Sequence, residues 1–292
     1  MSARSSLLPP VSRRARHVLA RRVQSLRRGE RELPTYFVVG AKRAGTTSLD
    51  EYIVDHPLVL RGLVEKGCRY YDVNYGRGPA WFRSHLPLVA DVDRRTRRLG
   101  GRPIVGESSP YYSFHPDAAR RIADDVPDAR LLFVLRDPVQ RAWSHYRYEV
   151  ARGFETLGPL EALAAEADRL AGLDLAADDP APLDDSTLAF AHRHFSYLSR
   201  SRYAAQLARL HRHFAPEQVL VLKSESLFAE PDATMGRVFE HLGLPAHRGR
   251  EHRAHKALGD ASVPADFRAA VESAVSDDLL ALTELAPGIG WA

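Results

Sequence analysis

The amino-acid sequence predicts an α/β fold: a single doubly wound domain whose central parallel sheet is covered by helices on both faces. Two observations predict it. Short apolar runs alternate along the chain with segments of helical period, which is the pattern of a parallel sheet. The first apolar run also passes through a glycine-bounded loop straight into a helical segment, as in a phosphate-binding loop. We expect the domain over residues 34–292, after a basic N-terminal extension over residues 1–33.

Four short apolar runs are the predicted strands. They are YFVVG at 36–40, PIVGE at 103–107, RLLFVLRD at 130–137 and QVLVLKSE at 218–225. Right-handed crossovers place the carboxyl ends of parallel strands at one edge of the sheet. We therefore expect the loops that follow the four strands to meet at that edge and to form the ligand site. These loops span 40–47, 107–112, 136–144 and 223–228.

Helical period marks the segments between and after these strands. The predicted helices are 46–56, 138–152, 196–214, 232–242 and 265–285. The second has Asp137 as a suitable N-cap and Pro138 at its first position. Residues 153–194 are alanine-rich and acidic, and the segment DLAADDPAPLDD within them is typical of a loop.

The charge of the chain is divided unevenly. Residues 1–33 hold nine arginines against two glutamates, a charge of +7, so the net +4 leaves −3 for the rest. The domain itself is therefore not expected to bind nucleic acid. Apolar residues of the extension fall near one helical face with arginines around it, which suits contact with an anionic membrane. A solvated extension, or a helix packed on the domain, is the alternative.

The cysteine content and the hydropathy of the sequence limit where in the cell the protein is expected. No apolar run approaches the roughly 20 residues that span a bilayer. The single cysteine, Cys68, excludes an internal disulfide and fits a reducing compartment. We expect a cytoplasmic protein, peripheral on membranes if the extension binds them. Close histidine pairs such as His192 with His194 have no third ligand at metal spacing, so no metal site is predicted.

The loop after the first strand, in GAKRAGTTSL (40–49), is suited to an anion. Small residues expose backbone N–H groups, and the helix N-terminus adds partial positive charge. A nucleoside-triphosphatase loop carries a lysine just after its second glycine, where this chain has Thr46. The cations stand inside the loop instead. The predicted binding residues are Lys42, Arg43, Ala44, Gly45, Thr46, Thr47 and Ser48.

A second stretch, RDPVQRAWSHY (136–146), spans a strand–helix junction. Arg136 ends a buried strand at the ligand edge, and Ser144 lies about two turns into the next helix. From these places the two side chains can converge on one anion. The alternative is that Arg136 is a structural ion-pair partner.

Together the two stretches resemble sulfotransferases that use 3′-phosphoadenosine 5′-phosphosulfate (PAPS), near the bacterial and heparan-sulfate-type branch. In that family a GxxRxGTTSL-like loop holds the 5′-phosphosulfate, and an RDPxxRAxSHY-like segment holds the 3′-phosphate through its Arg and Ser. The resemblance covers nearly all of 36–292. It extends to KGCRYYDVNYGRGPAWFRSHLP (66–87), GESSPYY (106–112), EHLGLP (240–245) and Trp291.

This resemblance implies a co-substrate and a reaction. PAPS would donate a sulfuryl group, without a metal, to a hydroxyl or amine of a saccharide or another small metabolite. Arg43 would stabilise charge on the bridging oxygen as the nucleotide leaves. The late basic segment HRAHKALG (252–259) resembles the family segment that folds over the cofactor phosphates, which adds Arg253 and Lys256 to the binding residues.

The general base is where the sequence departs from the family. The family segment often reads KExHFFD with Glu as the base, whereas this chain has Gly67 at that position. The remaining candidates are Asp72, Glu107 and Glu65, in that order, and each could equally be structural. Two other functions stay open: a magnesium-dependent nucleotide kinase or triphosphatase of the related loop fold, and a non-catalytic phosphonucleotide-binding protein.

Overall fold

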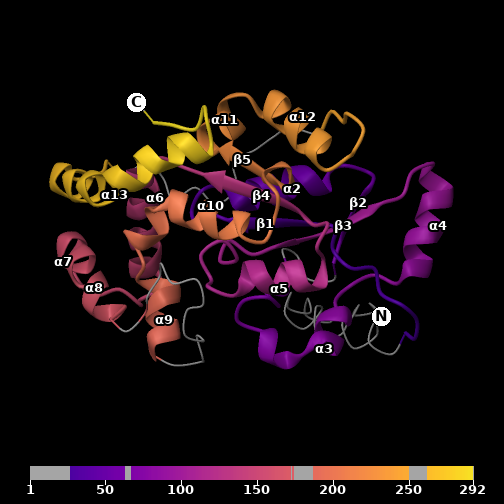
Figure 1. Ribbon diagram of the computed structural model, residues 1–292, viewed down its shortest axis with the longest axis horizontal. Helices are drawn as coiled ribbons and strands as arrows, with labels where there is room; N and C mark the ends of the chain where they lie inside the picture. The colour runs from indigo at the N-terminus through magenta and orange to yellow at the C-terminus, as the bar shows by residue number, and fades with distance from the viewer. Residues whose placement is uncertain (1–26, 63–66, 172, 174–186, 250–261, 292) are drawn as a thin grey trace, which may run out of the picture.

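A computed structural model describes residues 27–62, 67–171, 173, 187–249 and 262–291. At its centre lies a five-stranded parallel sheet with the strand order β2-β3-β1-β4-β5 (Figure 1). The strands are β1 (Tyr36–Gly40), β2 (Val59–Arg61), β3 (Ile104–Ser108), β4 (Arg130–Leu135) and β5 (Val219–Lys223). The helices are α2 (Thr46–Val54), α3 (Pro79–Arg83), α4 (Val89–Leu99), α5 (Ala118–Asp125), α6 (Pro138–Ala151), α7 (Pro159–Ala164), α8 (Glu166–Arg169), α9 (Thr187–His194), α10 (Tyr203–His211), α11 (Ser224–Ala229), α12 (Pro231–His241) and α13 (Ala265–Leu285).

The predicted α/β fold with a parallel central sheet is confirmed. All four predicted strands are present, and β2 is a short fifth strand at the sheet edge that the sequence did not reveal. The prediction of one helix over 196–214 is wrong in its first part. A 3₁₀ turn at Ser199–Ser201 is separated from α10 by Arg202, whose extended backbone (ψ 89°) interrupts the helix. The acidic region 153–194 also holds α7, α8 and the described helix α9.

Helices cover both faces of the sheet because the crossovers run in opposite directions. The chain passes from β1 toward the β2 edge, and later from β3 through β4 to the β5 edge. Right-handed connections then place α2 on one face and α5 on the other. Figure 1 shows this arrangement, with α2 and α12 above the sheet and α5 below it. Strands β1 and β4 are buried between these layers, and their carboxyl ends fix the position of the site.

The described end of the extension is attached to the domain. Glu32 N donates to Pro87 O and Val89 N donates to Glu30 O, each over 3.0 Å. Arg27 forms an ion pair of 2.5 Å with Asp91 at the start of α4. The boundary at residue 34 stays a prediction, and these contacts favour residues 1–26 as the segment to delete in testing it.

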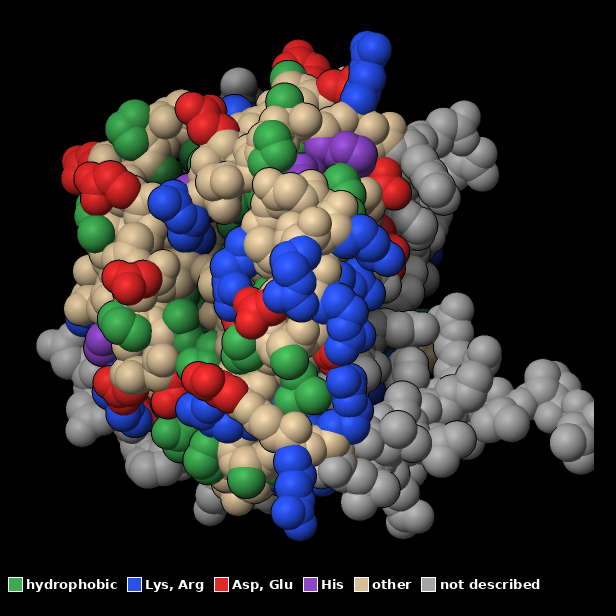
Figure 2. Space-filling model, turned by 90° about the vertical axis from the view of Figure 1, so that its right-hand side faces the viewer, with side chains coloured by type: hydrophobic (Ala, Val, Ile, Leu, Met, Phe, Trp, Pro, Cys, Tyr) green, Lys and Arg blue, Asp and Glu red, His purple; other side chains and the backbone are tan. Residues whose placement is uncertain are grey.

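Helix α4 carries much of the exposed positive charge at its end of the molecule. Its sequence VADVDRRTRRL buries only Val92 and exposes Arg94, Arg95, Arg97 and Arg98. Figure 2 faces this end and shows basic side chains gathered there. The weak negative charge of the domain is therefore distributed unevenly over its surface.

Candidate functional site

A cavity of about 1150 Å³ opens at the carboxyl edge of the sheet. All four loops that were predicted to meet at this edge contribute to its wall, so that prediction is confirmed. They provide Thr46, Ser108, Arg136 and Glu225, among others. The volume of the cavity lies just above the range of roughly 300–1,000 Å³ that is usual for small-molecule clefts.

The loop between β1 and α2 is shaped by its glycines. Gly45 has a φ of 92° at the N-cap of α2, a left-handed conformation that favours glycine. Of the seven predicted loop residues, five line the cavity and two do not. Those that line it are Lys42, Arg43, Gly45, Thr46 and Thr47. Ala44 and Ser48 are fully buried and face the protein interior.

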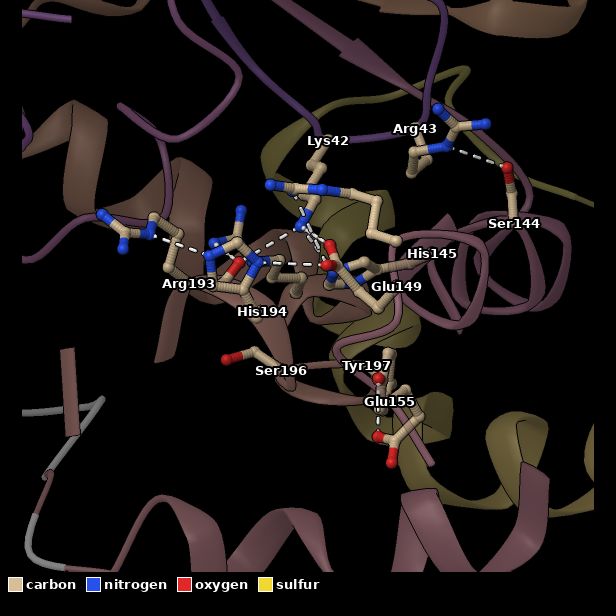
Figure 3. Close-up of polar contacts among 12 residues, drawn as sticks. Lys42, Arg43, Ser144, His145, Glu149, Glu155, Arg193, His194, Ser196 and Tyr197 are labelled. Carbon is tan, nitrogen blue, oxygen red and sulfur yellow. Dashed lines mark hydrogen bonds and ion pairs between the residues drawn. The ribbon is translucent and has the colours of Figure 1, made fainter. Parts of the chain in front are cut away.

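Arg43 contacts helix α6 at the cavity wall. Its Nε donates to Ser144 Oγ over 3.0 Å (Figure 3). Its guanidinium lies 4.8 Å from the ring centroid of Tyr148. Arg136 lines the same cavity from the end of β4. Helix α6 begins as predicted, with Asp137 accepting a hydrogen bond of 2.7 Å from Gln140 N. The structure therefore brings Arg43, Arg136 and Ser144 together on one cavity wall.

Lys42 turns away from its neighbour into a buried polar cluster. Its ammonium donates to Glu149 Oε1 over 2.6 Å, to Arg193 O over 3.1 Å and to His145 Nε2 over 2.7 Å (Figure 3). These three bonds use all three of its N–H donors. Burial lowers the pKa of Lys42, but a carboxylate at this distance favours the charged form. Its contacts show Lys42 joining the loop to α6 and α9, and its predicted cofactor role stays a prediction.

Asp72 lies behind the cavity wall. It is 4% exposed, accepts hydrogen bonds from Ser109 Oγ and Val73 N, both 2.5 Å long, and has an ion pair of 3.4 Å with Arg69. Burial raises the pKa of Asp72, against the opposing effect of Arg69. Asp72 is not among the residues that line the cavity. Its predicted role as the base stays a prediction, without direct support from this geometry.

Glu107 is also buried behind the wall. Its Oε1 accepts hydrogen bonds of 2.8 Å from both Tyr112 Oη and Arg69 N, and one of 3.5 Å from Cys68 Sγ. Burial raises the pKa of Glu107 to about 7, although the Tyr112 hydrogen bond opposes this. A Cβ on Gly67, whose φ is 141°, would lie 2.8 Å from Glu107 Cγ. The position at which the family often has glutamate is therefore filled by its neighbours in this chain.

Three predicted site residues lie outside the described residues. They are Glu65, Arg253 and Lys256. Their roles stay predictions.

The opposite part of the cavity wall was not predicted from the sequence. It combines basic side chains with aromatic rings and one histidine, His194, at the end of α9. The rest of this wall comprises Arg69, Tyr111, Tyr148, Arg152, Phe154, Phe190, Arg193 and Arg200. The only signal in the sequence was the cluster FAHRHF around His194, which had been weighed only as a metal ligand.

The described residues contain neither a cluster of metal ligands nor a helix that could cross a membrane. No group of three or more His, Cys, Asp or Glu side chains is placed to hold a metal ion there. Within the same part of the chain, no helix has both the length and the apolar character that crossing a membrane requires.

Comparisons with known proteins identify the family of this chain. Residues 77–248, more than half of the chain, match the family model described as "Sulfotransferase family". Human heparan sulfate glucosamine 3-O-sulfotransferase 3B1 is 31% identical over 216 residues, which are 74% of this chain and 47% of that protein. Human heparan sulfate glucosamine 3-O-sulfotransferase 6 is 33% identical over 74% of this chain and 54% of its own length. The chain thus spans about half the length of the curated relatives it matches.

One solved structure is similar over almost its whole length. A sulfotransferase from Alicyclobacillus acidocaldarius superposes with a TM-score of 0.64 at 26% identity. The superposition covers 87% of this chain and 96% of that one. The fold around the cavity is therefore one that a sulfotransferase adopts.

Proposed function

Because the chain belongs to the sulfotransferase family, we propose that it transfers a sulfuryl group from PAPS to a hydroxyl or amine of a saccharide acceptor. The observation that carries this proposal is the convergence of Arg43, Arg136 and Ser144 on one cavity at the carboxyl edge of the sheet. Two anionic groups of one nucleotide need donors from two directions. The loop after β1 and the start of α6 supply them.

The wall formed by the loop after β1 and by the start of α6, which we call the donor side of the cavity, fits PAPS. Backbone N–H groups at the start of α2, together with the Thr46 and Thr47 hydroxyls, suit the 5′-phosphosulfate. Arg136 and Ser144 would hold the 3′-phosphate by charge-assisted hydrogen bonds. Phe228 lines the same cavity and is 43% exposed. An aromatic ring in that position offers a stacking surface for adenine.

Arg43 supplies the electrostatic part of the chemistry. When the bond between sulfur and the bridging oxygen breaks, negative charge grows on that oxygen. A fixed guanidinium stabilises this charge more in the transition state than in the ground state. Arg43 meets this need because Ser144 and the Tyr148 ring hold it at the cavity wall.

The wall that contains Arg200 and the aromatic rings, which we call the acceptor side of the cavity, suits a sugar that carries acidic groups. Arg200 is 2% exposed, and its Nε and Nη1 have no hydrogen-bond partner among the described residues. Leaving such donors unsatisfied is costly, and a carboxylate or sulfate on the acceptor would satisfy them. Aromatic rings such as Tyr111 and Phe190 offer apolar surface for a sugar ring. The curated relatives are heparan sulfate glucosamine 3-O-sulfotransferases, which supports the same class of acceptor.

A kinase or triphosphatase is disfavoured by the same contacts. The lysine that reaches the terminal phosphates in those enzymes is replaced by Thr46. Lys42 cannot substitute for it, because all three of its donors are engaged with protein atoms. We accordingly propose a reaction that requires no metal.

Sulfuryl transfer from labelled PAPS tests the function directly. Heparan sulfate is the first acceptor to try, and a simple phenol is the comparison. We expect label on the saccharide and release of adenosine 3′,5′-bisphosphate (PAP), with EDTA present. Magnesium-dependent hydrolysis of ATP, with no label transferred to either acceptor, would contradict the proposal.

A cytoplasmic location, with the extension on an anionic membrane, also remains a proposal. The nine arginines of residues 1–33 support the membrane contact. The single buried thiol of Cys68 supports a reducing compartment.

A further inference from the structure

In the described part of the site, no proton-accepting side chain reaches the cavity at the position where the family often has glutamate. Gly67 has no room for a side chain, and the carboxylates of Asp72 and Glu107 are buried behind the wall in hydrogen bonds to the protein. Transfer to a hydroxyl nevertheless requires a group that takes the proton. Such a group must reach the cavity.

His194 reaches the cavity and is held by a carboxylate. Its Nδ1 lies 3.0 Å from Glu149 Oε2, and its Nε2 accepts a hydrogen bond of 3.1 Å from Arg193 Nε (Figure 3). Because arginine only donates, Nε2 must carry the lone pair and Nδ1 the proton. This is the tautomer in which a carboxylate orients an imidazole so that Nε2 can accept a proton.

Glu149 is suited to this positioning role. Burial would raise the pKa of Glu149, but its polar contacts with His145 and His194 and the charge of Lys42 hold it far below its usual range. It is therefore ionised at neutral pH. Its other oxygen accepts from Lys42, the residue next to Arg43, so one carboxylate connects His194 to the phosphosulfate loop.

The surroundings of His194 suit proton transfer at the cavity wall. Its ring packs against Phe190 and Phe154, with centroids 4.4 Å and 4.9 Å away. These rings shield the imidazole from bulk water on that side. The Tyr148 ring also lines the cavity, with its centroid 4.8 Å from the Arg43 guanidinium and 5.3 Å from that of Arg152.

We propose that His194 is the general base of the sulfuryl transfer and that Glu149 is its positioning residue. The inference rests on the proposed function. The acceptor hydroxyl takes the place of Arg193 Nε at His194 Nε2. Its O–H bond breaks, the proton moves to Nε2, and the oxygen lone pair forms the new bond to sulfur. The bond from sulfur to the bridging oxygen breaks, and its electron pair leaves with PAP.

The charges around His194 predict how the rate depends on pH. Burial lowers the pKa of His194, while Glu149 opposes this effect and Lys42 and Arg193 reinforce it. The imidazole is thus neutral at pH 7, and kcat should rise with pH through the His194 pKa to a plateau. The charged and titratable groups around it are Glu149, Arg152 and His145 from α6, Lys42 from the loop after β1, Arg193 from α9 itself, and Arg200 from the following turn.

The test compares full-length His194→Asn with wild type, using labelled PAPS and the best saccharide acceptor found. We expect kcat to fall about 10²- to 10⁴-fold with PAP affinity unchanged, and the acid limb of the pH profile to disappear. His194→Gln, whose amide can still donate to Glu149, should show the same loss of kcat. It provides the second variant if the first does not fold. Glu149→Gln should lower kcat at least about tenfold and move the limb to lower pH. His213→Asn, an exposed histidine beyond α10, is the matched control.

The outcomes separate this inference from the proposed function. Wild-type transfer that persists within about threefold in both His194 variants, or an acid limb that survives in them but is lost in Glu107→Gln, overturns the role of His194 and leaves the sulfotransferase activity standing. No transfer by the wild type to any acceptor overturns the proposed function, and the inference with it.

Discussion

Arg43 Nε donates to Ser144 Oγ over 3.0 Å, and this contact joins the loop after β1 to the second turn of α6. The two residues are far apart in sequence, but they lie in the segments that follow the carboxyl ends of the neighbouring strands β1 and β4. In the proposed function, this contact would fix the positions of the two anionic ends of one nucleotide relative to each other.

Substitution of Arg43 should affect turnover more than binding. We expect Arg43→Ala to lower kcat about a hundredfold, because loss of one transition-state donor costs about 3 kcal/mol. PAP affinity, measured by calorimetry, should change much less. Arg237→Ala, at an exposed position of α12, is the control. Equal losses in rate and affinity would assign Arg43 to ground-state anchoring alone.

Gly67 should tolerate no side chain. Its φ of 141° is strained for other residues, and a Cβ there would lie within 2.9 Å of atoms of Glu107 and Ser108. We expect Gly67→Ala to lower the free energy of unfolding by about 2–4 kcal/mol. Gly76→Ala is the matched control, because a Cβ at Gly76 meets nothing within 4 Å. Equal denaturation midpoints for the two variants would contradict the collision of a Cβ at Gly67 with its neighbours.

Glu107 should make stability depend on pH. Its pKa is about 7 in the folded chain against 4.5 for the free side chain, so the folded state keeps a proton that the unfolded state releases in this window. The stabilising contribution is complete below pH 4.5 and is lost as pH rises through 7. From pH 4.5 to above 7, the wild type should lose about 3 kcal/mol relative to Glu107→Gln. Urea denaturation of both proteins across this range measures the difference, and parallel curves would contradict it.

The basic extension should matter for membranes and not for the fold. Deleting residues 1–26 removes six arginines and keeps the contacts of residues 27–33 with the domain. We expect an unchanged thermal midpoint and unchanged activity on a soluble acceptor. Sedimentation with phosphatidylserine vesicles at low salt should be lost. If the full-length chain does not sediment with these vesicles, the membrane contact is wrong.

The sequence predicted the sheet and the donor side of the site because those features are local. Strand β1 is a continuous apolar run that ends in a glycine. The start of α6 is marked by Asp137 at its N-cap and Pro138 at its first position. Strand β2 was missed because it is three residues long and lies at the sheet edge. Helix α4 was missed because it buries a single residue, Val92.

The acceptor side could not be predicted because it depends on tertiary contacts. Glu149 and His194 are 45 residues apart, and the segment between them gives no clear period. Nothing in the sequence shows that the end of α9 meets the end of α6. Lys42 likewise reads as a phosphate ligand in the loop, and only its three partners in the structure show that it is engaged elsewhere.

The affinity for a 3′-phosphate tests the account most directly, because ADP and ATP have only a hydroxyl at that position. If Arg136 and Ser144 bind this phosphate, their hydrogen bonds should contribute about 2–4 kcal/mol. Calorimetry without magnesium should then show PAP binding roughly 30- to 1,000-fold more tightly than ADP. Arg136→Ala should abolish most of that preference and leave ADP affinity almost unchanged. Equal affinities of the wild-type protein for PAP and ADP would contradict the assignment of this cavity to PAPS.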